Sequence, residues 1–138
     1  MAYWLVKSEP NCWSWSDHVA AVVEPWDGVR NHQAANYMKS MCLGDLVFFY
    51  HSVNEKKIVG VLEVVSEAYP DASDATGKFV CVDLKSSSAL VQPVSLADIK
   101  TNPQLEQMTL LKQSRLSVMG VSEDEWIEIL RMAGGLQS

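Results

Sequence analysis

The sequence predicts an α+β fold, in which a mixed and strongly curved sheet of about five or six strands is flanked by one helix inserted after the first strand and another at the C-terminus. Short apolar segments rich in β-branched and aromatic residues alternate with polar turns along most of the chain. Two further segments carry apolar residues at helical spacing, each behind a helix-capping residue. The 138 residues, 48% hydrophobic and 20% charged, favour one domain over residues 1–138 with its own core.

The first part of the chain predicts a strand at residues 3–7 and one helical turn at residues 13–17. Asn31 can accept hydrogen bonds from the free amides of a first helical turn, so it predicts a helix that runs to about Met41 and ends at Gly44. Apolar residues at helical spacing predict its buried stripe: Ala34, Ala35, Met38, Met41 and Cys42.

The middle of the chain predicts strands separated by polar turns. The strands are residues 46–51, 58–65, 79–85 and 90–94. They are separated by a hairpin turn at residues 52–57, a loop at residues 71–78 and a turn or bulge at residues 86–88. Gly60 predicts a bulge or a close approach by another backbone segment. Pro93 predicts an edge strand, because proline has no amide hydrogen to donate to a neighbour.

The last part of the chain predicts short helical turns at residues 95–100 and 103–108, then a short strand at residues 114–118. Ser122 and Glu125 have the spacing of a capping box and predict the start of the last helix. The buried stripe of this helix comprises Trp126, Ile129, Leu130 and Ala133, and Gly134 and Gly135 end it.

The net charge of −6 argues against a protein that coats DNA or RNA through many phosphate contacts. Any binding to nucleic acid should therefore use a local patch and a pocket for a base. Lys56 and Lys57 lie in a predicted turn and are interpreted as ordinary solvated charges.

Three cysteines, Cys12, Cys42 and Cys81, are too few and too scattered for a disulfide framework, and Cys42 and Cys81 lie in apolar segments that predict core positions. No apolar run approaches the ~20 residues that span a bilayer, and the chain begins with no basic, cleavable leader. We therefore expect a cytoplasmic protein without a membrane segment.

The motifs of metal, nucleotide-cofactor and serine-nucleophile sites do not occur in the sequence. The three histidines have no metal-binding spacing, and the glycines form neither a phosphate loop nor a dinucleotide fingerprint. A nucleophile elbow is also lacking. The sequence therefore predicts no cofactor.

Five tryptophans are many for 138 residues. Trp4 and Trp126 fall on predicted core faces, whereas Trp13 and Trp15 fit either packing or a site. Trp26 lies in a loop outside any periodic pattern, between Pro25 and Asp27-Gly28. An aromatic side chain there can stack on a flat ligand or anchor the loop, and the pattern alone leaves both open.

Six blocks of sequence together resemble the EVE domain family and cover almost the whole chain in order. They are Tyr-Trp-Leu-Val-Lys-Ser-Glu-Pro (3–10), Trp-Asp-Gly-Val-Arg-Asn-His-Gln-Ala (26–34), Gly-Asp-Leu-Val-Phe-Phe-Tyr-His-Ser (44–52), Ile-Val-Gly-Val (58–61), Tyr-Pro-Asp (69–71) and Ser-Arg-Leu-Ser-Val (114–118). EVE domains belong to the PUA-like superfamily and are similar to the YTH readers of methylated RNA. The resemblance implies a small curved mixed β-barrel with peripheral helices.

The resemblance also implies a non-catalytic reader of a modified base, either C5-modified cytosine in DNA or a methylated base in RNA. Trp26 would stack on the base, and Ser8 and Glu9 would read its Watson–Crick edge, because a carboxylate accepts from an exocyclic amine. The other implied site residues supply amide contacts, backbone contacts or pocket walls: Lys7, Trp15, Arg30, Asn31, Gln33, Tyr50, His51, Ser52, Arg115 and Ser117. Trp13 stands where Tyr is expected and Ala35 where Arg is expected, and the missing Arg removes one possible interaction with the nucleic-acid backbone.

Two alternatives stay open. Lys7 and Glu9 lie on the same face of the first strand, so they can serve as an activating base and a proton carrier in a small hydrolase of modified nucleosides, like the ASCH relatives. The aromatic loop can instead dock a peptide. We expect a monomer that binds modified DNA or RNA, and a protein partner would help so acidic a chain reach its target.

Overall fold

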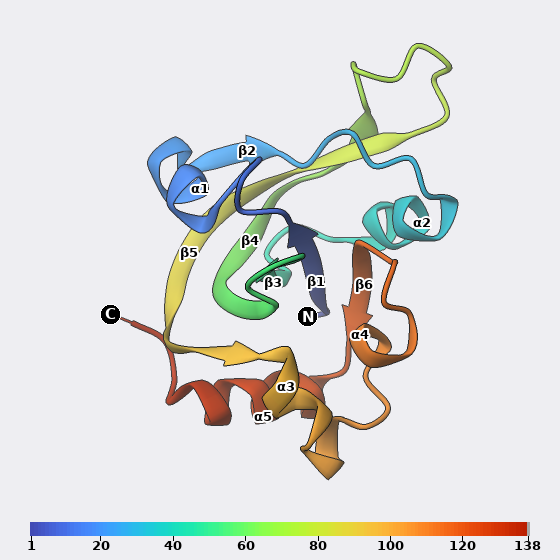
Figure 1. Ribbon diagram of the computed structural model, residues 1–138. Helices are drawn as coiled ribbons and strands as arrows, with labels where there is room; N and C mark the ends of the chain where they lie inside the picture. Colours follow the sequence, from blue (N-terminus) through green and yellow to red (C-terminus); the bar gives the residue numbers. More distant parts are fainter. Residues whose placement is uncertain (138) are drawn as a thin grey trace.

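The computed structural model describes residues 1–137. The strands are β1 (Tyr3–Ser8), β2 (Val23–Pro25), β3 (Leu46–His51), β4 (Lys57–Pro70), β5 (Val80–Ser95) and β6 (Val118–Val121). The helices are α1 (Trp15–Ala21), α2 (His32–Ser40), α3 (Leu96–Lys100), the 3-10 turn η1 (Pro103–Leu105), α4 (Thr109–Lys112) and α5 (Glu123–Ala133). Figure 1 shows the strands curving around a common centre, with α1 beside β2, α2 beside β6, and α3 and α5 grouped at one end.

The strands form one six-stranded sheet in the order β2-β5-β4-β3-β1-β6. β1 pairs in parallel with β3, from Tyr3 opposite Leu46 to Ser8 opposite His51, and every other pairing is antiparallel. Within residues 1–137 the edge strands β2 and β6 do not pair with each other, so the sheet is curved but not a closed barrel. The predicted α+β fold with a mixed, curved sheet is confirmed. No helix in these residues is long and apolar enough to cross a membrane.

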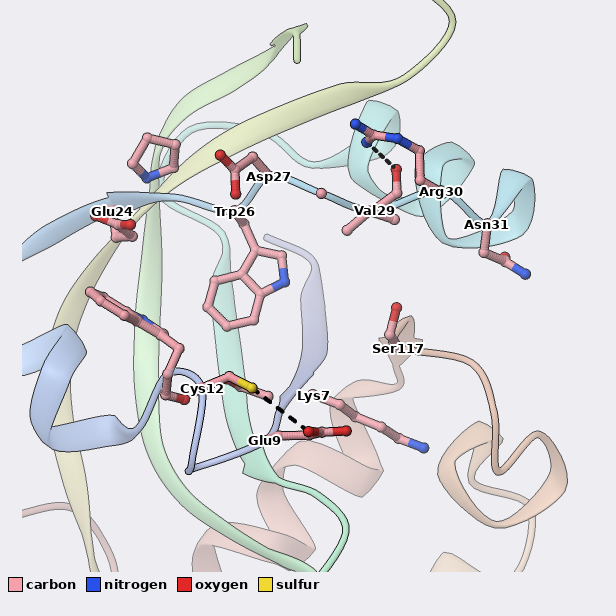
Figure 2. A pocket seen from close by; sticks show the side chains of 14 residues that line it. Lys7, Glu9, Cys12, Glu24, Trp26, Asp27, Val29, Arg30, Asn31 and Ser117 are labelled. Carbon is pink, nitrogen blue, oxygen red and sulfur yellow. Dashed lines mark hydrogen bonds between the residues drawn. The ribbon is translucent and has the colours of Figure 1, made fainter. Parts of the chain in front are cut away.

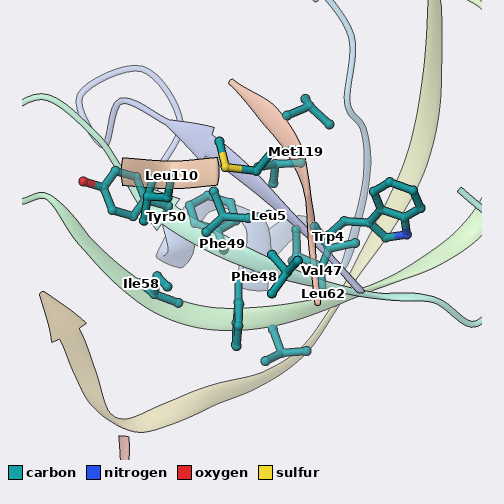
Figure 3. Close-up of a cluster of buried hydrophobic side chains, with 14 of the residues drawn as sticks. Trp4, Leu5, Val47, Phe48, Phe49, Tyr50, Ile58, Leu62, Leu110 and Met119 are labelled. Carbon is teal, nitrogen blue, oxygen red and sulfur yellow. The ribbon is translucent and has the colours of Figure 1, made fainter. Parts of the chain in front are cut away.

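The core lies inside the curve of the sheet, where β1, β3 and β4 contribute apolar side chains (Figure 3). The predicted central strand β3 is buried from Val47 to Tyr50. Trp126 of α5 stacks on Phe48 with ring centroids 3.7 Å apart and on Tyr3 at 4.6 Å. This aromatic stack holds the last helix against the sheet.

The bulge predicted at Gly60 is confirmed, whereas the group that approaches it closely is a side chain and not another backbone. The register between β3 and β4 shifts beside it, as at a bulge. A Cβ built on Gly60 would lie 2.5 Å from the ring of Trp15, so only glycine lets this indole approach the strand so closely.

The helix α2 begins as predicted, because the Asn31 side chain accepts from the amide of Ala34 at 2.9 Å. It ends at Ser40 with Met41 as its C-cap, close to the predicted end at about Met41. Gly44 has a left-handed φ of 86° as predicted, but it lies in the turn beyond the helix and does not end it. The cause is Asp45, whose carboxylate accepts from the amide of Cys42 at 2.9 Å and holds the chain in a turn. Cys42 is consequently exposed rather than part of the buried stripe, whereas Cys81 is buried as expected.

Several boundaries differ from prediction for tertiary reasons. The turn predicted at residues 13–17 extends into the full helix α1, and the short edge strand β2 follows it unpredicted. β5 continues through residues 86–88 with a register shift against β4, so of the predicted turn or bulge the bulge is confirmed. β2 pairs with Asp83–Lys85, and further along the same side of β5 Leu90 forms a bridge with Leu136, which leaves Pro93 at an edge as predicted.

The strand predicted at residues 114–118 begins only at Val118, and α4 precedes it. The amide of Leu116 donates to Gln113 O at 3.2 Å and Lys7 Nζ donates to Ser114 O at 2.8 Å, so residues 114–117 form a turn that holds a side chain from β1. The capping box of Ser122 and Glu125 at the start of α5 and the left-handed end at Gly134 are both as predicted.

Candidate functional site

A pocket of about 510 Å³ opens where β1 ends and where β2 leads into α2 (Figure 2). It brings together seven of the residues predicted for the site: Lys7, Ser8, Glu9, Trp26, Arg30, Asn31 and Ser117. Residues that the sequence did not single out for the site complete its wall: Cys12, Trp13, Glu24, Pro25, Asp27, Gly28 and Val29. The volume lies within the range of small-molecule sites.

Trp26 projects its indole toward the middle of the pocket (Figure 2). Its amide donates to Val82 O at 2.7 Å, which extends the pairing of β2 with β5 by one residue. The half-buried ring packs edge-on against Phe49 at 5.6 Å and lies 6.0 Å from the ring of His18. Trp26 therefore anchors its loop to the core and still lines the pocket, which joins the two interpretations that the sequence left open.

Trp13 lines the same pocket and is held by a buried histidine. Its Nε1–H donates to His18 Nδ1 at 3.0 Å, and His18 Nε2 lies 2.7 Å from Leu84 O. These contacts require a neutral imidazole with its proton on Nε2, since Nδ1 accepts and Nε2 donates. No pattern in the sequence points to this role, because His18 lies in α1 and reaches its partners only in the folded chain.

We expect His18 to make stability depend on pH. Burial lowers the pKa of His18, although the hydrogen bond to Leu84 opposes this. Because the pKa of His18 is lower in the folded than in the unfolded protein, neutral His18 contributes fully to stability above the unfolded pKa of ~6.5. This contribution declines as the pH falls below that value. The melting temperature should therefore fall more steeply between pH 7.5 and pH 5 for the wild type than for His18→Gln. Parallel curves would contradict this assignment.

Ser8 and Glu9 lie at the end of β1, but only the side chain of Glu9 is available to bind a ligand. The Ser8 hydroxyl donates to Trp13 O, so it positions the neighbouring wall. The exposed Glu9 carboxylate has one partner among residues 1–137, the Cys12 thiol at 3.8 Å. It can therefore accept hydrogen bonds from a ligand in the pocket.

Lys7 closes the pocket on the side of β6. Its backbone amide donates to Ser117 O at 2.9 Å, and its Nζ donates to Ser114 O at 2.8 Å. Burial lowers the pKa of Lys7. The ammonium group is thus held in place by a neutral carbonyl, which leaves its charge available to an anion.

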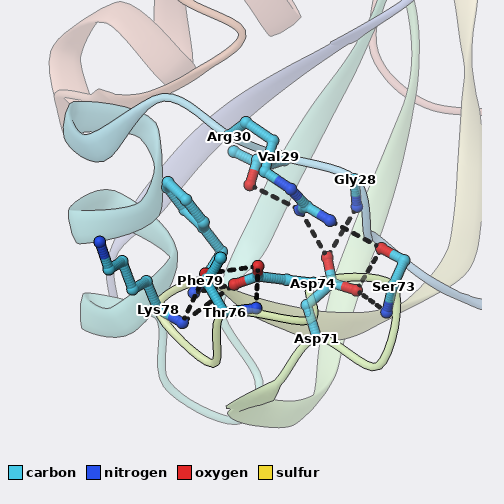
Figure 4. A network of polar contacts seen from close by, with 9 residues as sticks. All are labelled: Gly28, Val29, Arg30, Asp71, Ser73, Asp74, Thr76, Lys78 and Phe79. Carbon is cyan, nitrogen blue, oxygen red and sulfur yellow. Dashed lines mark hydrogen bonds and ion pairs between the residues drawn. The ribbon is translucent and has the colours of Figure 1, made fainter.

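The loop after Trp26 is fixed by the buried carboxylate of Asp71 (Figure 4). Asp71 accepts from the Gly28 amide at 2.8 Å, from Arg30 Nη1 at 3.2 Å and from the amide and hydroxyl of Ser73. Burial by itself would raise the pKa of Asp71, but these donors lower it to about 2. Arg30 also donates to the Ser73 hydroxyl at 3.0 Å, so this pocket residue, predicted to contact the nucleic-acid backbone, also holds the loop in place.

Asp71→Asn should destabilise the protein by about 1–3 kcal/mol, because the variant lacks a charged acceptor of several hydrogen bonds. Because the pKa of Asp71 is lower in the folded than in the unfolded protein, ionised Asp71 stabilises the wild type fully above the unfolded pKa of ~3.9. This stabilisation declines as the pH falls toward 2. Urea unfolding at pH 7 and pH 3 measures both effects. Asp27→Asn is the control, because the Asp27 carboxylate is exposed and has no hydrogen bond among residues 1–137; equal stability of the two variants would contradict the prediction.

The remaining predicted site residues lie beside or outside this pocket. Gln33 and Arg115 line a neighbouring cavity of about 320 Å³, and Tyr50 and Ser52 line another, described below. Trp15 packs on Gly60 and Phe49 instead. His51 accepts from the Trp15 amide at 3.0 Å and lies 2.8 Å from Glu55, so both of its ring nitrogens are engaged outside the pocket. Residues 1–137 contain no cluster of side chains that could hold a metal ion.

Comparison with known proteins identifies relatives that share most of this chain. Residues 2–132 match the family described as EVE domain. Thymocyte nuclear protein 1 of Rattus norvegicus is 34% identical over 94% of this chain and 73% of its own length. The NMR structure of a protein from Rhodopseudomonas palustris is 53% identical with a TM-score of 0.92, covering 97% of this chain and 94% of that one.

A further similar structure is that of human THYN1 in complex with DNA containing 5-methylcytosine. It is 30% identical with a TM-score of 0.89, and the match covers 96% of this chain and 98% of that one. The resemblance found in the sequence blocks is thus confirmed over nearly the whole chain. The chain belongs to the EVE domain family.

Proposed function

We propose that this protein is a non-catalytic reader that captures one modified base, with 5-methylcytosine in DNA as the favoured ligand. The observation that carries the proposal is the half-buried indole of Trp26 in a pocket large enough to admit a base, opposite a carboxylate that lacks a strong partner. The DNA complex of human THYN1 supports it through the shared family and fold.

Each part of the pocket has a chemical role in this proposal. The Trp26 ring offers a face for stacking, which is worth about 1–3 kcal/mol per base in single-strand binders. Glu9 accepts from the exocyclic amine of cytosine, and uracil or thymine would present a carbonyl oxygen there instead. A methyl group adds little apolar area, so discrimination should reach only about 10- to 200-fold.

Calorimetric titration with short oligonucleotides tests the proposal. The series holds one cytosine, 5-methylcytosine or N6-methyladenine in an otherwise identical strand. We expect 5-methylcytosine to bind most tightly, and Glu9→Gln to weaken binding, because the glutamine amide repels the exocyclic amine in one orientation. Binding of all strands with equal affinity, or of none, would refute base reading.

A nucleoside hydrolase is the second candidate. Lys7 and Glu9 line the same pocket, and the lowered pKa of Lys7 is a property that catalytic lysines need. Incubation of the protein with modified nucleosides and nucleotides, followed by chromatography, separates the two candidates. Product formed by the wild type but not by Lys7→Met would favour the hydrolase.

A further inference from the structure

A second cavity, of about 540 Å³, adjoins the base pocket and shares Lys7, Glu9 and Ser117 with it. The rest of its wall comes from the end of β3, the following turn, α3 and the segment before β6. The residues that matter for its chemistry are Tyr50, Ser52, Lys56, Lys100 and Arg115. The two cavities therefore open side by side on one face of the protein.

Positive charge is concentrated in this cavity although the protein carries a net charge of −6. Within residues 1–137, Lys56, Lys100 and Arg115 have no carboxylate within 4.0 Å, since the ion pairs involve other cations. Lys7 adds a further charge, and Glu9 is the one acidic residue on the wall. Such a local excess of cations favours an anion.

Tyr50 supplies an observation that does not depend on charge. The residue is only 3% exposed, but no buried side-chain polar atom among residues 1–137 lacks a hydrogen-bond partner, so its unpaired hydroxyl must reach the surface. Figure 3 shows the hydroxyl directed away from the apolar cluster. Since Tyr50 lines the second cavity, its accessible hydroxyl can donate to a ligand there. Burial raises the pKa of Tyr50, which keeps the hydroxyl protonated as a donor.

The backbone places Lys56 beside α3. Lys56 has a φ of 51°, which is uncommon for a residue with a side chain. Its carbonyl accepts from the Leu96 amide at 2.8 Å, which ties the turn to the first residue of α3. Lys100 is the last residue of the same helix. The Lys56 side chain is exposed and forms no ion pair among residues 1–137, as expected for a solvated charge, but its backbone is bound to the cavity wall.

We propose that the second cavity binds a phosphate group of the nucleotide chain next to the base held in the first pocket. Ammonium, guanidinium and hydroxyl groups are the donors that proteins use for phosphate oxygens. Glu9, at the border, repels the phosphate from the base pocket and so sets which cavity receives which part of the ligand. This inference rests on the proposed function, but it makes a separate prediction: a strand binds more tightly than a free nucleoside.

Two trinucleotides test the inference by NMR on isotopically labelled protein. One carries a central 5-methylcytosine, and the other is abasic at that position with the same phosphates. We expect both to shift the amide signals of Ser52, Lys56 and Lys100, and only the first to shift the indole signal of Trp26. Inorganic phosphate at equal phosphate concentration should produce weaker shifts than the abasic strand.

Charge variants measure how much each cation contributes to binding. In Lys56→Gln and Lys100→Gln, the slope of log affinity against log salt for the methylated trinucleotide should fall by about 0.7 for each phosphate that the variant no longer neutralises. Tyr50→Phe should weaken binding about 5-fold or more, because it removes one hydrogen-bond donor. Lys85→Gln is the control, because Lys85 is an exposed cation on β5 opposite β2.

The outcomes separate the two proposals. If the methylated strand shifts Trp26 while neither strand shifts Ser52, Lys56 and Lys100, the phosphate site is refuted and the base reader stands. If the abasic strand shifts these amides while Trp26 never responds, the base reader fails and the phosphate site stands. Equal shifts from inorganic phosphate would refute recognition of a strand.

Discussion

Trp26→Ala should weaken binding of a methylated oligonucleotide by about 10- to 100-fold, which corresponds to the loss of one stacked base. The variant should also be less stable, because the ring packs against Phe49 and His18. Trp26→Phe keeps an aromatic face and should retain part of the affinity. Titration calorimetry gives the affinity, and urea unfolding gives the free energy of unfolding for each variant.

Trp15→Ala provides the matched control for this experiment. Trp15 is another half-buried tryptophan that packs edge-on against Phe49, at 5.6 Å, but it does not line the base pocket. We expect it to lower stability without a comparable change in the affinity of the folded protein. If Trp26→Ala lowered stability only, Trp26 would be an anchor and stacking would have to come from Trp13.

Gly60→Ala should destabilise the protein by about 1–3 kcal/mol, as other overpacked cores are destabilised. The new methyl group would lie 2.5–2.6 Å from three carbons of the Trp15 ring. That ring cannot simply turn away, because it packs on Phe49 and its backbone amide is bound to His51. The measurement is the midpoint of urea unfolding.

A double variant tests whether the clash with the Trp15 ring causes the destabilisation of Gly60→Ala. Trp15→Leu removes the ring atoms that Gly60→Ala would meet, so the two changes together should cost less than the sum of the single changes. Gly120→Ala is the control, since a Cβ there would have its nearest neighbour at an ordinary 3.5 Å. Additive effects of Gly60→Ala and Trp15→Leu would show that the cost lies in the backbone of β4 instead.

The sequence correctly predicted the helices and strands that depend on residues close to one another in the chain. The Asn31 cap, the Ser122–Glu125 capping box and the buried run of β3 depend on neighbouring residues and were found where expected. The predictions of secondary structure were wrong where contacts with residues far away in the sequence determine the conformation. β2 exists because three residues pair with β5, and residues 114–117 form a turn that receives Lys7 from β1.

In the candidate site, too, features visible in a short stretch of sequence were predicted, whereas contacts between distant residues were not. Trp26 stood out as a loop tryptophan in the sequence, and the resemblance to the EVE domain family implied the base-reading roles of Trp26 and Glu9. The support behind them was not predicted, because His18 contacts Trp13 from another element and Asp71 reaches Gly28 across 43 positions of sequence. Whether each predicted residue touches a ligand stays a prediction for the titrations above.

The parallel pairing of β1 with β3 has a consequence for the order of folding. Neighbouring parallel strands need a long crossover, and residues 9–45 supply it here, with Trp13, His18 and Trp26 on it. The crossover is a loop whose ends meet only when the two strands pair, so its closure entropy must be overcome first. The wall of the pocket should thus acquire protection from hydrogen exchange together with the centre of the sheet, and a chain that has folded only locally would have no site.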